Sequence, residues 1–318
     1  MKLAAWILLL AAVAAAAVWA VAERFYRIAF VRAKEEPVDI NALGKPWTAY
    51  LDEVRDGIEW FLSHVTEEVS VSSFDGLRLT ARVIEQENAR GTALLCHGDR
   101  SQGVLAFSCA FSFYYEQGLN LVVIDERACG LSEGDTITFG LNESRDVRTW
   151  LDWVNGRYGE DRPVVLGGVS MGCTTVLLSL EHDLPSNVVG IIGDCGFTSP
   201  WDQLTYILRR DYHLPPFPLM HLVNVLFRRR TGCDLRAKST VTALGNNTRI
   251  PVLFIHGGAD RFVPTDFSRE NYRACAADKD LLIVESAAHA TSFLADPIAY
   301  RKRAKAFLDR VLDGKDGR

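Results

Sequence analysis

The feature that most constrains the fold of this chain is an alternation of short apolar runs with amphipathic stretches, from Val69 onward. Several runs stop at a glycine or an acidic residue, as 119–124 does at Asp125. Continuous apolar runs of this length are typical of strands buried on both faces, and helices between such strands favour a parallel sheet. We expect an eight-stranded, mostly parallel sheet with helices on both faces, and a ligand site beyond the carboxyl ends of the strands. The expected strands are 69–73, 77–84, 92–96, 119–124, 163–166, 188–192, 250–255 and 281–284.

Helical patterns fill the segments between these runs. Apolar residues recur at helical spacing over 147–154 and again over 300–311. The second stretch begins with Asp296 as a helix cap and Pro297 at the first helical position. Asp75-Gly76, between the first two runs, is typical of a hairpin turn. The sequence therefore predicts one α/β domain over residues 69–318 that opens with a hairpin.

Charge and cysteine content narrow the classes of partner. The chain of 318 residues has a formal net charge of -5, which gives no reason to expect nucleic acid as a partner. Its seven cysteines are an odd number, and they form no CxxC pair and no cluster with His at metal-ligand spacing. We expect mostly reduced, structural cysteines and neither a metal nor a cofactor. The sequence does not indicate an oligomeric state.

A charge-free apolar stretch occupies positions 3–22 and is long enough to cross a bilayer as a helix. It is open to two favoured interpretations, ahead of a third in which it is a buried helix of a soluble protein. One is a retained single-pass anchor, with membrane lipid as a partner. The other is a cleaved signal, in which Lys2 supplies the positive region and Ala20-Val21-Ala22 the cleavage pattern. The run exceeds the 7–15 residues or so of an ordinary signal core, which favours the anchor. Residues 1–34 are accordingly expected to form the anchor, or the signal, with its flank.

Two further features concern the region that follows this stretch. Four basic residues lie between positions 24 and 34, against Lys2 alone before the stretch. The positive-inside rule would then keep the body in the cytoplasm, whereas export after signal cleavage would place it outside. Residues 35–68 are expected to form a linker, with loop at Glu35-Glu36-Pro37, and a juxtamembrane helix over 47–64 that packs on the body.

The motif Gly168-Val169-Ser170-Met171-Gly172 carries the strongest chemical signal. It follows an expected strand and precedes a helical stretch, which is the context of a nucleophile elbow. Such a turn holds its serine in a strained conformation, so the flanking residues must be small. The helix that follows favours developing negative charge at its N-terminus. We therefore expect Ser170 to be a nucleophile.

A serine nucleophile needs a general base and an acid that orients the base. His289 and Asp260 follow the last two expected strands, in the order that goes with such an elbow, Ser then acid then His. Asp194, at the end of the strand before these, is a rival acid whose expected role is structural. His97 and His256 each precede a glycine at a strand end, where a histidine usually shapes a turn.

An oxyanion hole needs two backbone N–H groups near the nucleophile. One is expected from Met171, the residue after the serine, and the other from the loop after the strand 92–96. In that loop Asp99 is the preferred donor and Arg100 the next choice, with the Asp99 side chain expected to point away.

Five blocks of sequence can be considered together: Cys96-His97-Gly98, 125–132, 168–172, 256–260 and His289. In this order they resemble bacterial α/β-hydrolases, most of all the serine-aminopeptidase and monoacylglycerol-lipase-like branch. The resemblance covers roughly 69–312 and implies an α/β-hydrolase fold with a Ser-His-Asp triad. One departure is Ala128, where the family usually has glycine.

The insert 196–249 contains no strand pattern and reads as a helical lid, with helices over 201–210 and 221–230. Its apolar residues either cover an acyl-binding pocket or only pack on the body. The favoured hypothesis is a serine hydrolase that cleaves small-molecule carboxylic esters, lipid-like acyl esters among them, through an acyl-enzyme. The alternatives are an aminopeptidase or amidase, a thioesterase, or a membrane-tethered binding protein without turnover.

Overall fold

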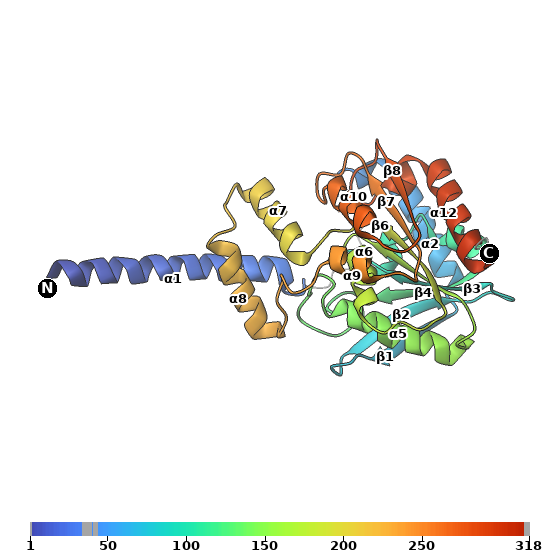
Figure 1. Ribbon diagram of the computed structural model, residues 1–318, viewed down its shortest axis with the longest axis horizontal. Helices are drawn as coiled ribbons and strands as arrows, with labels where there is room; N and C mark the ends of the chain where they lie inside the picture. The colour runs from blue at the N-terminus through green and yellow to red at the C-terminus, as the bar shows by residue number, and fades with distance from the viewer. Residues whose placement is uncertain (1, 34–39, 41–43, 315–318) are drawn as a thin grey trace.

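The computed structural model describes residues 2–33, 40 and 44–314. Its centre is one eight-stranded sheet with the order β1-β2-β4-β3-β5-β6-β7-β8 (Figure 1). The pairs β1–β2 and β2–β4 are antiparallel, and all other pairs are parallel. The predicted eight-stranded, mostly parallel sheet is thus confirmed. The strands are β1 (Glu67–Ser72), β2 (Arg78–Ile84), β3 (Gly91–Cys96), β4 (Leu119–Asp125), β5 (Val164–Val169), β6 (Val188–Asp194), β7 (Val252–Gly257) and β8 (Lys279–Val284).

Helices cover both faces of the sheet because alternate residues of each central strand point to opposite sides. On one face, Leu94 and Leu166 pack with Trp150 of α5. On the other face, Leu95 and Val165 pack with aromatic residues of α2, α4 and α12. The helices are α2 (Leu51–His64), α3 (Gly103–Ala106), α4 (Phe111–Glu116), α5 (Glu143–Tyr158), α6 (Met171–Leu178), α9 (Thr240–Asn246), α10 (Thr265–Ala274), α11 (Ser292–Ala295) and α12 (Pro297–Leu312).

Several local expectations can be compared with these elements. The hairpin forms between β1 and β2, and the side chain of Asp296 accepts a hydrogen bond from the Ala299 amide at the start of α12. The helix expected over 47–64 is a short 3₁₀ turn followed by α2, which packs on α4 through stacked Phe61 and Phe111 rings. The loop expected at 35–37 lies outside the described residues.

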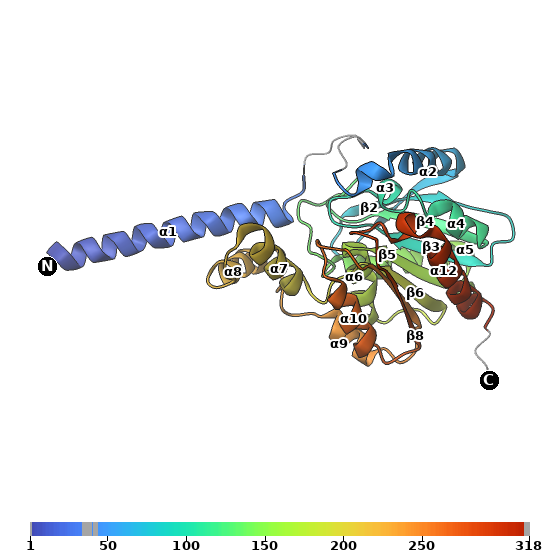
Figure 2. The same ribbon diagram turned by 90° about the horizontal axis from the view of Figure 1, so that it is seen from above.

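The N-terminal helix α1 (Lys2–Phe30) projects from the body, and the lid helices α7 (Pro200–Tyr212) and α8 (Leu219–Thr231) lie beside it (Figures 1 and 2). It is the one helix in the described part of the chain that is long and apolar enough to cross a membrane. The helix continues eight residues past Ala22, where the apolar run ends. A third hydrophobic cluster joins its last turns to the lid and to residues 128–141.

Candidate active site

Ser170 occupies a strained turn between the end of β5 and the start of α6. Its backbone has φ 57° and ψ -117°, a conformation that non-glycine residues seldom adopt. The two flanking glycines are required by crowding. A Cβ on Gly168 would lie 2.3 Å from the carbonyl oxygen of Gly172, and a Cβ on Gly172 would lie 2.0 Å from that of Cys96. The turn therefore presents the serine side chain at the carboxyl edge of the sheet.

The structure brings together the three side chains predicted for the triad. The Oγ of Ser170 lies 2.9 Å from Nε2 of His289, and Nδ1 of His289 lies 2.7 Å from Oδ2 of Asp260. Because a carboxylate only accepts hydrogen bonds, Nδ1 is the donor to Asp260, which leaves Nε2 to accept the serine proton. This tautomer is the one that a general base in such a site requires.

Asp260 is held as a carboxylate by several donors. Its Oδ1 accepts hydrogen bonds from the amides of Phe262 and Val263, at 2.8 and 2.9 Å. Its Oδ2 is also 3.2 Å from Nε2 of His256. Burial alone would raise the pKa of Asp260, but the hydrogen bonds from His256 and His289 lower it well below its ordinary value. The carboxylate is therefore charged and can stabilise an imidazolium at His289.

The contact between His256 and Asp260 was not anticipated from the sequence, where His256 was expected only to shape a turn. Its imidazole is fully buried and also contacts Oγ of Ser268 and the carbonyl of Val263. The one signal in the sequence was the spacing of four residues between His256 and Asp260, which would bring the two side chains together on a helix. These residues do not lie on a helix, because strand β7 ends between them.

Asp194, the rival acid, is placed differently. Its backbone carbonyl accepts a hydrogen bond from the Ser170 amide at 2.8 Å, and its side chain accepts one from Ser292 at 3.3 Å. No hydrogen bond joins its carboxyl to His289 among the described residues. Burial raises the pKa of Asp194 to about 6. Its contacts are those of a residue that supports the turn at Ser170.

The two predicted oxyanion donors flank the serine. A Cβ on Gly98 would lie 3.3 Å from Cβ of Ser170, so the loop after β3 passes directly beside the nucleophile. Within the described residues, the amides of Asp99 and Met171 form no hydrogen bond. Both are therefore free to bind an oxyanion. The buried ring of His97 fixes this loop, since its Nδ1 donates to the Gly98 carbonyl and its Nε2 accepts from the Glu126 amide.

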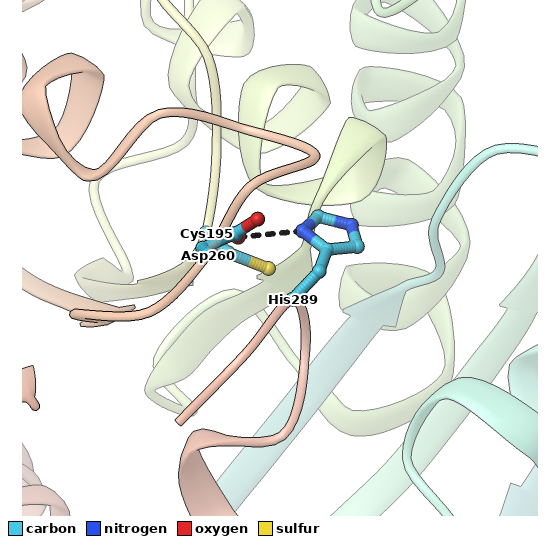
Figure 3. A group of neighbouring side chains, drawn as sticks. All are labelled: Cys195, Asp260 and His289. Atoms are coloured by element: carbon cyan, nitrogen blue, oxygen red, sulfur yellow. Dashed lines mark hydrogen bonds and ion pairs between the residues drawn. The ribbon is translucent and has the colours of Figure 1, made fainter. Parts of the chain in front are cut away.

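Cys195 stands beside the acid and the base (Figure 3). One ligand atom from each of Cys195, Asp260 and His289 falls within 4.8 Å of the others, a spacing that could suit a metal ion. However, Nδ1 of His289 and Oδ2 of Asp260 are already hydrogen-bonded to each other. Burial also raises the pKa of the Cys195 thiol well above its ordinary value, and metals bind the thiolate. In this cluster His289 and Asp260 form a hydrogen-bonded base–acid pair, and Cys195 is a buried thiol beside them.

A cavity of about 210 Å³ opens at Ser170 and is lined mostly by apolar side chains. Leu204 and Leu208 of α7 and Met220 and Val223 of α8 form part of its wall. The helices expected over 201–210 and 221–230 therefore do border the site. Asp99, expected to point away, also lines the cavity; its Oδ2 lies 3.5 Å from Nη1 of Arg100.

The cavity has a second wall that sequence reasoning missed. Phe25, Ile28, Ala29 and Phe30, all from the end of α1, line it together with Ser170. From the sequence, these residues were expected to belong to the flank of the anchor or signal. Their only visible signal was that aromatic and apolar residues continue past Ala22 at helical spacing.

Comparison with known proteins gives distant relatives. No protein-family model matches the chain. The Bacillus subtilis (strain 168) protein YqkD is 27% identical over 265 residues, which cover 83% of this chain and 86% of YqkD. YfhR of Salmonella typhimurium is 24% identical over 233 residues, which cover 71% of this chain and 75% of YfhR. Both are described as uncharacterized, so neither name states an activity.

Solved structures identify the fold. An esterase from Pyrococcus furiosus superposes with a TM-score of 0.64 at 20% identity, over 79% of this chain and 94% of that chain. The α/β hydrolase GrgF from a Penicillium species gives a TM-score of 0.61 at 16% identity, over 78% and 99% of the two chains. The chain therefore has the α/β-hydrolase fold, as predicted. The narrower resemblance to the serine-aminopeptidase and monoacylglycerol-lipase-like branch stays a prediction.

Proposed function

We propose that this protein is a serine hydrolase that cleaves carboxylic esters through an acyl-enzyme on Ser170, His289 and Asp260. The observation that carries the proposal is the pair of hydrogen bonds from Ser170 to His289 and from His289 to Asp260, at 2.9 and 2.7 Å. Structural neighbours described as esterases, in Pyrococcus furiosus and Rhodothermus marinus, support the same class of reaction.

The proposed reaction has two steps, acylation of Ser170 and hydrolysis of the acyl-enzyme. Oγ of Ser170 attacks the ester carbonyl while its proton passes to Nε2 of His289, and the carbonyl becomes an oxyanion. The amides of Asp99 and Met171 stabilise that oxyanion. Collapse of the intermediate breaks the ester bond, and His289 gives its proton to the departing alcohol. A water molecule then repeats the sequence on the acyl-serine, which releases the carboxylic acid and restores Ser170.

The cavity indicates which part of the substrate it binds. Its wall is apolar on the sides formed by α7, α8 and α1, and burial of apolar area drives binding there. We therefore expect esters with an apolar acyl portion to be preferred over acetyl esters. Thioesters and amides would use the same three side chains, so they serve as comparison substrates.

The first test is covalent labelling of the full-length protein in detergent with an alkyl fluorophosphonate probe. Labelling and hydrolysis of p-nitrophenyl esters are expected in the wild type and are expected to be lost in Ser170→Ala. Asp260→Asn should lower kcat by roughly 10⁴-fold, because the wrong imidazole tautomer is then favoured. Asp194→Asn is the matched control, with a loss expected to stay below about tenfold since Asp194 has no bond to His289.

Three outcomes would contradict the assignment in whole or in part. Equal labelling of Ser170→Ala and wild type would remove the serine from the mechanism. A greater loss in Asp194→Asn than in Asp260→Asn would exchange the two acids. A folded wild-type protein that neither labels nor hydrolyses any ester, thioester or amide would instead favour a binding protein that keeps the fold.

A further inference from the structure

The N-terminal helix has two parts with different surroundings. Its side chains from position 3 to position 21 are exposed and almost wholly apolar, which is what a segment that lies in lipid requires. From Ala22 onward one side of the helix is buried, with Ala22, Tyr26 and Phe30 in contact with the protein. The helix therefore belongs both to a membrane-spanning segment and to the packed body.

Specific contacts fix the last turns of α1 in place. The ring of Phe30 packs on Phe227 of α8, with 4.7 Å between ring centroids. Arg230 of α8 forms an ion pair with Glu23 at 2.7 Å, and its guanidinium lies over the ring of Tyr26. The Phe30 carbonyl accepts a hydrogen bond from the Ile137 amide. These contacts come from both the lid and the body, so the end of α1 is held as part of the fold.

This fixed end of α1 is also a wall of the pocket at Ser170. Phe25, Ile28 and Ala29 line the cavity together with side chains of α7 and α8. The ring of Phe25 makes an edge contact with Tyr212, at the end of α7, with 4.7 Å between centroids. Ile28 is 44% exposed although it lines the cavity, so it stands at the mouth. The acyl pocket therefore opens along the side of the helix that leads into the membrane.

The surface around this mouth has the composition of a membrane interface. The loop that joins α7 to α8 lies on the side away from the sheet, along the projecting part of α1 (Figures 1 and 2). It exposes apolar side chains, among them Phe217, which is 71% exposed. Arg229 lies over the ring of Trp19, a pairing of the residues that are enriched at the headgroup level. Phe25 is six residues beyond Trp19, or about 9 Å along the helix.

From this arrangement we propose that the last two turns of α1 are a specificity-determining part of the acyl pocket, and that the hydrolase draws a long-chain ester from the bilayer that α1 spans. The inference rests on the proposed function. The partner is a lipid surface, and its acyl chains reach Ser170 by sliding between α1 and the lid loop. The apolar tip of the lid, with Phe217, lies in the same surface.

The first arm of the test narrows the pocket from the α1 side. Ala29→Trp places a large ring in the cavity, and Arg24→Trp places the same ring five residues earlier on an exposed position that does not line it. We expect the ratio of long-chain to acetyl ester hydrolysis to fall at least tenfold in Ala29→Trp and to stay within twofold in Arg24→Trp. Should Ala29→Trp fail to fold, Ala29→Leu is expected to lower the ratio by a smaller factor. An unchanged ratio in a folded Ala29 variant would overturn the inference.

The second arm asks where the substrate comes from. The full-length protein is placed in phosphatidylcholine vesicles that contain a long-chain glyceryl ester, and the ester's mole fraction in the membrane is varied at constant total concentration. We expect the rate to follow the mole fraction, and we expect Phe217→Asp to lower it more than it lowers hydrolysis of a soluble acetyl ester. A rate that stays constant while the mole fraction of the ester changes would overturn the inference. Failure of the proposed function is distinguished separately, as loss of all Ser170-dependent labelling.

Discussion

At the scale of single residues, the pKa values of two buried carboxyl groups near His289 are shifted in opposite directions by their surroundings. Asp260 accepts hydrogen bonds from two amides and two imidazoles, which lowers its pKa. Among the described residues the Asp194 carboxyl accepts one hydrogen bond, from Ser292, and burial raises its pKa to about 6. Both carboxyls are buried, but the hydrogen bonds to Asp260 outweigh the effect of burial there, whereas the single bond to Asp194 does not.

This difference predicts how stability depends on pH. The unfolded chain loses the Asp194 proton near pH 4, while the folded chain keeps it to about pH 6. Between these values the folded state binds more protons, so the free energy of unfolding falls as pH rises, by about 3 kcal/mol in all. Asp194→Asn removes this loss.

The check is thermal unfolding of both full-length proteins in detergent at several pH values from about 4 to about 7. The stability of Asp194→Asn relative to wild type should increase across that range and then level off. A difference that stays constant with pH would show that Asp194 does not titrate in this window.

At the scale of elements, the approach of α6 to β3 depends on Gly172. Gly172→Ala would place a Cβ 2.0 Å from the Cys96 carbonyl oxygen, so α6 would have to move away from the strand. We expect a loss of about 1–3 kcal/mol in stability and a large loss of probe labelling, because Ser170 moves with the helix. Urea unfolding and labelling rates measure the two effects.

Gly156→Ala is the matched control for that substitution. Gly156 lies inside α5, and a Cβ there would meet no heavy atom within 4 Å. Alanine favours a helix over glycine, so this variant should gain about 0.5–1 kcal/mol without any change in labelling. Equal losses in the two variants would mean that crowding at the turn is not the cause.

The loop after β4 shows the same dependence on backbone geometry. Ala128 has φ 60°, in the left-handed region that favours glycine. This is the position where the resembled family usually carries glycine, and the structure supplies the reason. Arg127 beside it is buried and paired with Asp146 at 2.6 Å, which ties the loop to α5.

At the scale of the whole molecule, the N-terminal helix is either a retained anchor or a signal, and the two differ in the fate of its exposed apolar half. Cleavage after Ala22 would remove the exposed half but leave Phe25, Tyr26 and Phe30 against the lid. If α1 is retained, full-length protein should stay in the membrane pellet after carbonate washing, because about 20 apolar residues remain in the bilayer. The intact mass of the purified protein shows whether residues 1–22 are retained. A mass that corresponds to a chain beginning at Glu23 would contradict retention of the anchor.

Much of the fold was predictable because its signals are local. Apolar runs such as those of β3 and β4 are buried on both faces, and all eight expected strands form within a few residues of their predicted bounds. The turn at Ser170 is likewise encoded by Gly168 and Gly172, whose lack of a Cβ the close contacts require. The order Ser170, Asp260, His289 along the chain was also visible in the sequence.

Other features depend on which distant segments meet, and only the tertiary structure decided them. Asp194 ends β6 and Asp260 lies in the loop after β7, and the placement of these two strands determines which carboxyl lies 2.7 Å from His289. The pocket wall combines residues 25–30 with the lid and Ser170, more than a hundred positions away. Periodicity identifies α1 as an apolar helix but does not state its neighbours. The apolar character of that helix is thus a property of the sequence, whereas its place beside the nucleophile is a property of the packed chain.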